Sequence, residues 1–373
     1  MLFILTEDPM NGVIQSQVLT HIKYLKQNKI INASILFCYW NNEMFKFLQS
    51  SEKFIKKNYS IRIDSLKILP PSIIFSNFLN KRTICKYYKK KKKNIQYIHA
   101  RTDLCAVLSE NLKNCSDSKL IWDCRGYAPA ELDYEKKKFN FLRKFFLISR
   151  FKRACKISDK VIAVSNYLKQ KIKKNGNLNT YLIPSVASKK IFYFNEKVRQ
   201  QVRNRLGIGK RSIVFIYSGS LKKYQMFDET LSFFKNFNEK KKSYLIILSN
   251  ELSSAKQKIK NYENIFLFSV DHKKVNDYLN AADYAIMIRK KDQTNNAASP
   301  TKFAEYCLTG LEVVTNSAVT DYYSLAKDIN NVHNIASFRP NFITKANRKK
   351  IAEIYKKKIS REAYKKIYEE IYK

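Results

Sequence analysis

Long apolar runs, regular cysteine spacings and acidic residues are all in short supply in this sequence. No apolar run approaches the roughly 18 to 20 residues that a membrane-spanning helix needs, and no cleavable signal pattern opens the chain, so we expect a protein that does not cross a membrane. The cysteines are odd in number and never spaced C-x-x-C, which argues against a disulfide framework or a zinc site and favours the reducing cytoplasm. They are Cys38, Cys85, Cys105, Cys115, Cys124, Cys155 and Cys307.

The shortage of acidic residues leaves a strong positive charge. Lys and Arg number 71 against 31 Asp and Glu, which gives a formal net charge of +40. Such a charge attracts polyanions, and by itself it does not choose among nucleic acid, an anionic membrane face and phosphorylated substrates. Part of the lysine excess has a simpler explanation, because abundant Lys, Asn, Ile and Tyr with only seven Gly and seven Pro is the pattern of an AT-rich coding sequence.

The sequence does contain a regular alternation of short apolar runs with longer segments of helical period. Its 373 residues suffice for about two domains, and 45% of them are hydrophobic, so a packed fold is expected. The alternation predicts an α/β fold in which parallel strands are joined by helical crossovers. The expected strands are 2–6, 31–37, 61–68, 95–98, 120–123, 160–164 and 181–183 in a first series and 212–217, 244–248, 265–268, 282–288 and 312–315 in a second, and 341–373 is expected to be helical.

The few glycines lie where such a fold would use them. Gly12, Gly126 and Gly219 each follow a predicted strand, and Gly310 closes a helix immediately before one, as a C-cap does. Ligands of open α/β sheets bind beyond the carboxyl ends of strands, so the first three are candidate ligand loops. Tight-turn geometry alone explains any one of them.

The strongest local signal is the segment 298–310, which follows the strand that ends in Ile288-Arg289. Ser299 is expected to cap a new helix, and Pro300 suits its first turn. The free N–H groups and the positive dipole end at that start make a phosphate site.

Three side chains of this helix extend the phosphate site. Thr301 and Lys302 add a hydroxyl and a cation, and Glu305, one and a half turns on, is placed to accept hydrogen bonds from a ribose diol. The alternative is an ordinary capped helix with a surface glutamate.

With these residues the sequence resembles the family-four retaining glycosyltransferases of GT-B fold. Members carry a Glu-x7-Glu element whose helix runs into a glycine before a strand, matched here by Glu305-Tyr-Cys-Leu-Thr-Gly-Leu-Glu-Val-Val. The resemblance implies that Glu305 binds the ribose of a nucleotide-sugar. The first glutamate, which contacts the transferred sugar in the family, is replaced by Ala297. The form Ala-Ser-Pro-x-Lys-Phe-x-Glu-Tyr looks like a variant of the family that has diverged at this position.

Further matches lie in the second half of the chain. The segment 213–225 resembles the strand and loop that open the donor domain, where basic residues grip the diphosphate, so the resemblance makes Gly219, Lys222 and Lys223 donor-binding candidates. Ala281-Ala-Asp283 resembles the lead into the donor-site strand, in which Asp283 is expected to be structural.

The first half matches in its strand ends. The segment 8–14, with Gly12, resembles the loop near the transferred phosphate and sugar. Asp123 and Arg125 follow the fifth strand, where the family places acceptor and sugar contacts, and they are the catalytic candidates. A self-contained turn salt bridge is an equal alternative for this pair. His99 and Arg101 close another strand as weaker candidates.

The resemblance implies an architecture of two Rossmann-like, doubly wound domains that face each other across a cleft. The expected domains are 1–190 on the acceptor side, 191–345 for the nucleotide-sugar, and a C-terminal helix, 346–373, whose return to the first domain is left open. The implied activity is a hexosyltransferase-like transfer from a nucleotide-sugar to a glycan or lipid-linked acceptor in surface polysaccharide assembly. Such transfer is retaining and needs neither a metal ion nor a cofactor, since Lys222, Lys223 or Lys302 with the helix start would stabilise the leaving diphosphate.

A basic and aromatic segment suggests where a lipid-linked acceptor is met. Residues 136–156 hold nine Lys or Arg and no acid, interleaved with phenylalanines, which suits the anionic inner face of a membrane. Phe139, Leu142, Phe145 and Phe146 share a helical arc that Arg153 also enters, so part of that arc is expected to be core.

Three other functions remain open at this stage. A nucleic-acid-binding protein fits the basic and aromatic stretches but lacks a recognisable binding module, so no nucleic acid is expected. Epimerisation or hydrolysis of a nucleotide-sugar would use the same fold. An inactive partner subunit is conceivable because of Ala297.

Overall fold

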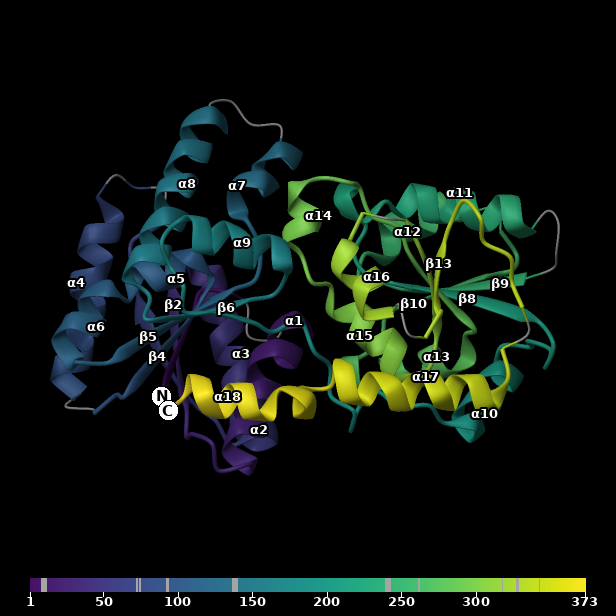
Figure 1. The fold of residues 1–373 in the computed structure, drawn as a ribbon, viewed down its shortest axis with the longest axis horizontal. Helices are drawn as coiled ribbons and strands as arrows, with labels where there is room; N and C mark the ends of the chain where they lie inside the picture. The colour runs from purple at the N-terminus through teal and green to yellow at the C-terminus, as the bar shows by residue number, and fades with distance from the viewer. Residues whose placement is uncertain are drawn as a thin grey trace. The chain divides into compact units, whose positions relative to one another are not determined.

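The chain divides into two α/β units, each built on its own parallel sheet. The computed structural model describes residues 1–7, 12–71, 73, 75–91, 94–135, 140–238, 243–260, 262–316, 318–326, 329–341 and 343–373. The first unit comprises Met1–Pro184, Ala297–Ser299 and Tyr364–Lys373, and the second comprises Ser185–Asn296 and Pro300–Ala363. The last ten residues, drawn in yellow in Figure 1, therefore belong with the first unit.

The first unit is built on a parallel sheet of seven described strands. Their spatial order is β3-β2-β1-β4-β5-β6-β7. The sheet extends from β1 through β2 to β3 on one side and from β4 to β7 on the other, so the topological switch point lies between β1 and β4. Helices cover both faces (Figure 1), as in a doubly wound fold. The strands are β1 Leu2–Leu5, β2 Ser34–Tyr39, β3 Arg62–Lys67, β4 Tyr97–Arg101, β5 Lys119–Cys124, β6 Lys160–Ala163 and β7 Thr180–Leu182.

The helices of this unit alternate with its strands. They are α1 Gly12–Ile14, the π-helical turn η1 Gln15–Leu19, α2 Thr20–Gln27, α3 Asn42–Tyr59, α4 Ser76–Lys91, α5 Thr102–Leu108, α6 Glu110–Ser116, α7 Ala128–Glu131, η2 Leu132–Tyr134, α8 Asn140–Ile157, α9 Asn166–Lys174 and, from the end of the chain, α18 Lys365–Ile371.

The second unit repeats the same winding with six described strands. Their order, β10-β9-β8-β11-β12-β13, places the switch point between β8 and β11. The strands are β8 Ile213–Ser218, β9 Ser243–Leu248, β10 Ile265–Phe268, β11 Tyr284–Met287, β12 Glu312–Thr315 and β13 Val332–Asn334. The remaining helices of the chain are α10 Glu196–Arg205, η3 Lys223–Gln225, α11 Phe227–Asn238, α12 Leu252–Lys258, η4 His272–Lys274, α13 Val275–Ala281, α14 Gln293–Ala297, α15 Thr301–Leu308, α16 Thr320–Ala326, α17 Lys345–Lys358 and η5 Arg361–Tyr364.

The twelve strands expected from the sequence are all present, and the differences lie at their ends. The largest shifts are of three residues: β2 begins at Ser34 rather than at residue 31, and β4 ends at Arg101 rather than at residue 98. The three-residue edge strand β13 was not predicted, because Val332–Asn334 carries no apolar run. The expected continuous helix over 341–373 was wrong. It is broken at Ser360, which forms an isolated bridge to Ala187 and whose hydroxyl accepts from the amide of Ala363.

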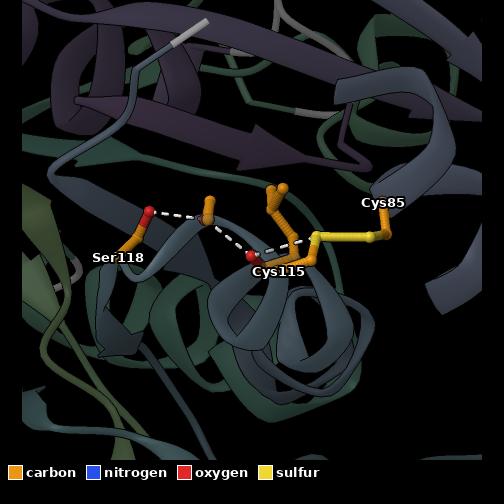
Figure 2. Close-up of a disulfide and its surroundings, with 5 residues drawn as sticks. Cys85, Cys115 and Ser118 are labelled. Carbon is orange, nitrogen blue, oxygen red and sulfur yellow. Dashed lines mark hydrogen bonds between the residues drawn. A yellow bond between two sulfur atoms is a disulfide. The ribbon is translucent and has the colours of Figure 1, made fainter. Parts of the chain in front are cut away.

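Two cysteines are paired, contrary to the expectation from their number and spacing. Cys85 of α4 and Cys115 of α6 form a disulfide with their Cα atoms 6.8 Å apart, as Figure 2 shows. An odd total does not preclude one bridge, and the helical packing that brings positions 85 and 115 together has no signature in the spacing. The five other cysteines are free and buried.

The basic helix α8 also departs from expectation. Leu142, Phe145 and Phe146 were expected to lie partly in the core, but they are 46%, 69% and 67% exposed, and Phe141 is 70% exposed. The helix packs instead through its C-terminal half, where Phe151 is buried against Trp122. Phe139 lies outside the described residues. No helix among the residues that the structure describes is both long and apolar enough to span a membrane.

Gly310 illustrates why the second unit needs a glycine after α15. Its φ of +77° is left-handed, and a Cβ there would overlap the backbone carbonyl of Arg348 in α17. The expected C-cap role is confirmed. α15 can therefore end against α17 only if this position lacks a side chain.

We predict that Gly310→Ala destabilises the second unit more than Gly207→Ala does. Gly207 has a similar φ of +66° but open space where a Cβ would lie, so it is the matched control. The left-handed backbone should cost about 1–2 kcal/mol in both variants, and the overlap should add about 1–3 kcal/mol at Gly310 alone. Urea unfolding measures both, and equal losses would contradict this packing.

Candidate functional site

The carboxyl ends of the central strands of the first unit meet in a buried charged cluster. Arg101 ends β4 and pairs in register with Asp123 of β5, which places both on the same face of the sheet. Arg101 Nε donates to Glu7 Oε2, just beyond β1, at 2.8 Å. The cluster therefore lies at the switch point, where ligands of this fold class bind.

Asp123 is the centre of this cluster. It is only 1% exposed, and its carboxylate contacts Arg125 Nε at 2.7 Å and both Arg101 Nη1 and His99 Nε2 at 3.6 Å. Burial alone would raise the pKa of Asp123, but the charges of Arg125 and its other partners outweigh it and hold the pKa below its usual range. The Asp123–Arg125 pair is thus not a self-contained turn salt bridge, because it is joined to two residues of β4.

The C-terminal segment closes one side of the cluster. His99 Nδ1 and the hydroxyl of Tyr372 lie 2.9 Å apart, and the Tyr368 ring packs against His21 with the ring centres 4.6 Å apart. Burial lowers the pKa of His99, so the ring is held in its neutral form. His99 links β4 to the C-terminal segment. Of the three residues that contact Asp123, Arg125 is the most exposed, with 18% of its side chain accessible.

The predicted phosphate loop of the first unit is only partly described. Gly12 begins α1 and has open space around the position of a Cβ. Residues 8–11 of the predicted loop lie outside the described residues.

The start of α15 differs from the expectation in its cap. The helix begins at Thr301, Pro300 is the N-cap residue, and no side chain makes a capping hydrogen bond, so the expectation that Ser299 caps the helix was wrong. The φ of −61° at Pro300 suits the cap position as well as the first turn. The amide of Phe303 donates to Pro300 O at 3.1 Å, and the hydroxyl of Tyr322 donates to the same oxygen.

Glu305 is buried, which contradicts the alternative of a surface glutamate. It is 2% exposed, and its carboxylate contacts Lys302 Nζ at 2.9 Å and His272 Nε2 at 3.5 Å. Burial would raise the pKa of Glu305, but the charge of Lys302 and the contact with His272 lower it below the ordinary value. The second turn of α15 therefore presents an ionised carboxylate within the unit.

The loop after β8 carries the predicted donor-binding lysines. Lys222 and Lys223 are exposed, and Lys222 Nζ lies 6.0 Å from the centre of the Tyr224 ring. The amide of Gly219 donates to Leu248 O at 3.0 Å, so this N–H belongs to the sheet. A Cβ at Gly219 would crowd the Gln225 side chain.

Three residues near this edge were not singled out from the sequence. His272 contacts Glu305, and the hydroxyl of Tyr306 accepts from the amide of Ser218 at the end of β8, at 3.1 Å. Arg289 follows β11 and is 8% exposed. The only available signal was that Arg289 ends a predicted strand, as Arg101 does in the first unit.

Asp283 has the structural role that was expected. It is buried at the amino end of β11, where Arg199 Nη2 and Arg203 Nη2 donate to its two oxygens at 2.5 and 2.7 Å, and the amide of Val214 also donates to it. The residue holds α10 against the sheet, at the end opposite to the predicted donor site.

The second unit thus places a carboxylate, two loop lysines and a helix N-terminus near the carboxyl edge of one sheet. A buried carboxylate suits a diol, and the cations suit phosphoryl oxygens. Among the described residues no group of three or more His, Cys, Asp or Glu is arranged to hold a metal ion.

We predict that Asp123→Asn destabilises the protein near pH 7 by about 3–5 kcal/mol, because Arg101 and Arg125 lose a buried partner. The folded pKa of Asp123 is depressed, so its stabilising contribution is present above the unfolded value of about 4 and is lost as the pH falls below it. The free-energy difference between wild type and variant should therefore shrink between about pH 5 and pH 2. Urea unfolding at several pH values measures it.

Asp133→Asn is the control for this experiment. Asp133 pairs with Lys144 on the surface, and its side chain is 63% exposed, so its substitution should change stability by less than about 1 kcal/mol. A pH-independent difference for Asp123→Asn would mean that its carboxylate is not selectively stabilised in the folded state.

Comparison with known proteins gives matches in structure but not in sequence. No family model matches the sequence, and no curated protein matches it. The structure is similar to sucrose-phosphate synthase from Thermosynechococcus elongatus, with 12% identity, a TM-score of 0.71 and coverage of 100% of this chain and 97% of the other.

Two further matches also extend over almost the whole chain. A glycosyltransferase from Rickettsia africae has 15% identity and a TM-score of 0.67, with 100% of this chain and 98% of the other covered. Anabaena HepE, solved in complex with UDP-glucose, has 12% identity and a TM-score of 0.66, with 99% and 98% covered. With its two doubly wound parallel sheets, the chain therefore has the GT-B fold of these glycosyltransferases.

Proposed function

We propose that the protein is a glycosyltransferase that moves a sugar from a nucleotide-sugar to a glycan or lipid-linked acceptor in surface polysaccharide assembly. The observation that carries the proposal is the buried, ionised Glu305 on the second turn of α15, at the carboxyl edge of the second sheet. Lys302 and His272 offset the cost of burying this carboxylate, and two ribose hydroxyls would complete its hydrogen bonds. The match to HepE solved with UDP-glucose supports a nucleotide-sugar donor.

The donor diphosphate would lie between the start of α15 and the loop after β8. Thr301 and Lys302 begin the helix, and Lys222 and Lys223 lie in the loop. These groups would stabilise the charge that develops on the leaving diphosphate without a metal ion. The acceptor would attack from the face that the diphosphate leaves, which gives retention. Gly219 would shape the backbone around the phosphates rather than contribute a side-chain contact.

The first unit would supply the acceptor side. Asp123 is buried and fully engaged, so its proposed role is to hold Arg125 and Arg101 in position. Arg125 would contact the acceptor. In this proposal Asp123 acts through Arg125 and is a positioning residue.

The acceptor would be met at a membrane surface through α8. Its first two turns expose Phe141, Leu142, Phe145 and Phe146. Contiguous exposed aromatic residues are rare on monomers and suit the boundary between headgroups and acyl chains.

The charge of α8 is more balanced than its sequence suggested. Four of its cations pair with acids from neighbouring elements, namely Arg143 with Glu135, Lys144 with Asp133, Arg150 with Asp103 and Arg153 with Glu110. The apolar side chains would therefore supply most of the membrane affinity, and the net charge of +40 would favour anionic lipid.

We predict that a thermal-shift screen finds a nucleotide-sugar that stabilises the wild type, and that Glu305→Gln weakens its binding at least about tenfold, because charged hydrogen bonds to the ribose are lost. UDP-glucose is the first donor to test. Glu353→Gln is the control, since Glu353 lies on the exposed side of α17 and pairs only with Lys356.

Product analysis completes this test. Release of free sugar, with or without acceptor, would show that the protein hydrolyses the nucleotide-sugar instead, and formation of an epimer would show that it is an epimerase. Absence of binding by every nucleotide-sugar would contradict a donor site at Glu305.

We predict that the double variant Phe145→Ser/Phe146→Ser lowers binding to vesicles containing anionic lipid at least about tenfold, because two large apolar side chains no longer enter the interface. Vesicle flotation measures the bound fraction. Leu178→Ser is the matched control, since Leu178 is 77% exposed and lies on a different loop. An equal loss of vesicle binding in the double variant and in Leu178→Ser, or equal binding by the wild type and the double variant, would rule out α8 as the membrane contact.

A further inference from the structure

Arg289 occupies a fixed place at the switch point of the second sheet. It follows β11 by two residues, next to the end of β8, and it is 8% exposed. Its amide donates to Asn316 Oδ1 at 3.1 Å, and Asn316 Nδ2 donates to its carbonyl at 2.6 Å. The Asn316 side chain, just beyond β12, therefore binds both the amide and the carbonyl of Arg289.

The Arg289 guanidinium differs from the other buried arginines. Among the described residues it has no hydrogen bond or ion pair, although nine tenths of the side chain is buried. Every other buried arginine that the structure describes has partners, whether carboxylates, backbone carbonyls or other contacts: Arg101, Arg199, Arg203, Arg348 and Arg361. A buried cation without a partner is unfavourable, so such an arginine indicates a place where an anion binds.

The surroundings of Arg289 favour an anion from outside the chain. Burial raises the pKa of the hydroxyls of Tyr217 and Tyr306, and the positive charge of Arg289 acts on both in the opposite direction, which places it near the end of β8. The nearby carboxylate of Glu305 already contacts Lys302 and His272. Glu251, whose charge also acts on Tyr217, accepts from the amide of Leu221, and no described carboxylate forms an ion pair with Arg289.

We propose that Arg289 binds an oxyanion of the donor substrate, a phosphoryl or carboxylate group, at the switch point between β8 and β11. Its planar guanidinium forms a two-point contact with such a group, which the lysines of the neighbouring loop cannot do. The inference deepens the proposed donor site and rests on it only for the identity of the ligand, because an oxyanion can be tested without a nucleoside.

Titration calorimetry with inorganic pyrophosphate, UDP-glucose and UDP-glucuronate tests the proposal on wild type and Arg289→Met. If the guanidinium binds phosphoryl oxygens, its loss should lower the affinity for pyrophosphate and for both nucleotide-sugars by about 10- to 100-fold. If it binds a sugar carboxylate, only the affinity for UDP-glucuronate should fall. Unchanged affinity for all three overturns the proposal.

The stability of the ligand-free protein provides a second readout. Methionine fills a similar volume without a charge, so Arg289→Met should be at least as stable as the wild type. Arg203→Met is the matched control and should lower the melting temperature, because Asp283 loses a partner. An equal drop for Arg289→Met would reveal a structural role and contradict the proposal.

Arg289→Lys is the second variant, in case Arg289→Met does not fold. It keeps the charge but not the two-point contact, so it should bind the affected ligands more weakly than the wild type, and wild-type affinity would overturn the proposal. The same measurements distinguish a failure of the anion site from a failure of the proposed function. Pyrophosphate binding that depends on Arg289, without any effect of Glu305→Gln on UDP-glucose, would keep the anion site and reject the ribose contact, and the opposite result would keep the donor site and reject Arg289.

Discussion

The need to neutralise buried arginines organises both sheets. In each unit one aspartate contacts two arginines: Asp123 contacts the buried Arg101 and the partly exposed Arg125, and Asp283 contacts the buried Arg199 and Arg203. In a chain with 71 basic and 31 acidic residues, buried carboxylates are scarce, and some buried arginines use backbone carbonyls instead. Arg348, for example, donates to the carbonyls of Asn280, Ala282 and Thr309.

The two aspartates serve different ends of their sheets. Asp283 lies at the amino end of β11, where its ion pairs join α10 to the sheet. Asp123 lies at the carboxyl end of β5, so its partners are held at the edge where ligands bind in this class of fold. The same interaction thus stabilises one unit and positions charged groups in the other.

Much of the fold could be predicted because parallel strands buried on both faces are continuous apolar runs. Strands such as Ile265–Phe268 and Glu312–Thr315 were placed to the residue, whereas Val332–Asn334 has no apolar run and could not be found. The break at Ser360 was equally hidden, since neither glycine nor proline marks it. The exposed phenylalanines of α8 show the limit of helical periodicity, which identifies an apolar arc but not whether anything covers it.

The candidate site was predictable only as far as residue type and strand ends allow. Glu305 and Lys302 were found from the helix start and the resemblance, but the contact from His272 comes from another element, and no local pattern records it. Arg289 was visible as the residue after a strand, yet nothing in its neighbours indicated that it would be buried without a partner. Whether a buried arginine has a partner depends on which groups distant segments bring next to it, and the local sequence does not record this.

The division of the chain also determines the order in which it can fold. Both termini belong to the first unit, and Met1 packs against the same apolar cluster as Tyr372 (Figure 1). In topology the second unit is an insertion between Pro184 and Tyr364, apart from the short return at Ala297–Ser299. During synthesis on the ribosome, the unit that is begun first is therefore completed after the second unit, because Tyr372, which contacts His99, is synthesised after every residue of the second unit.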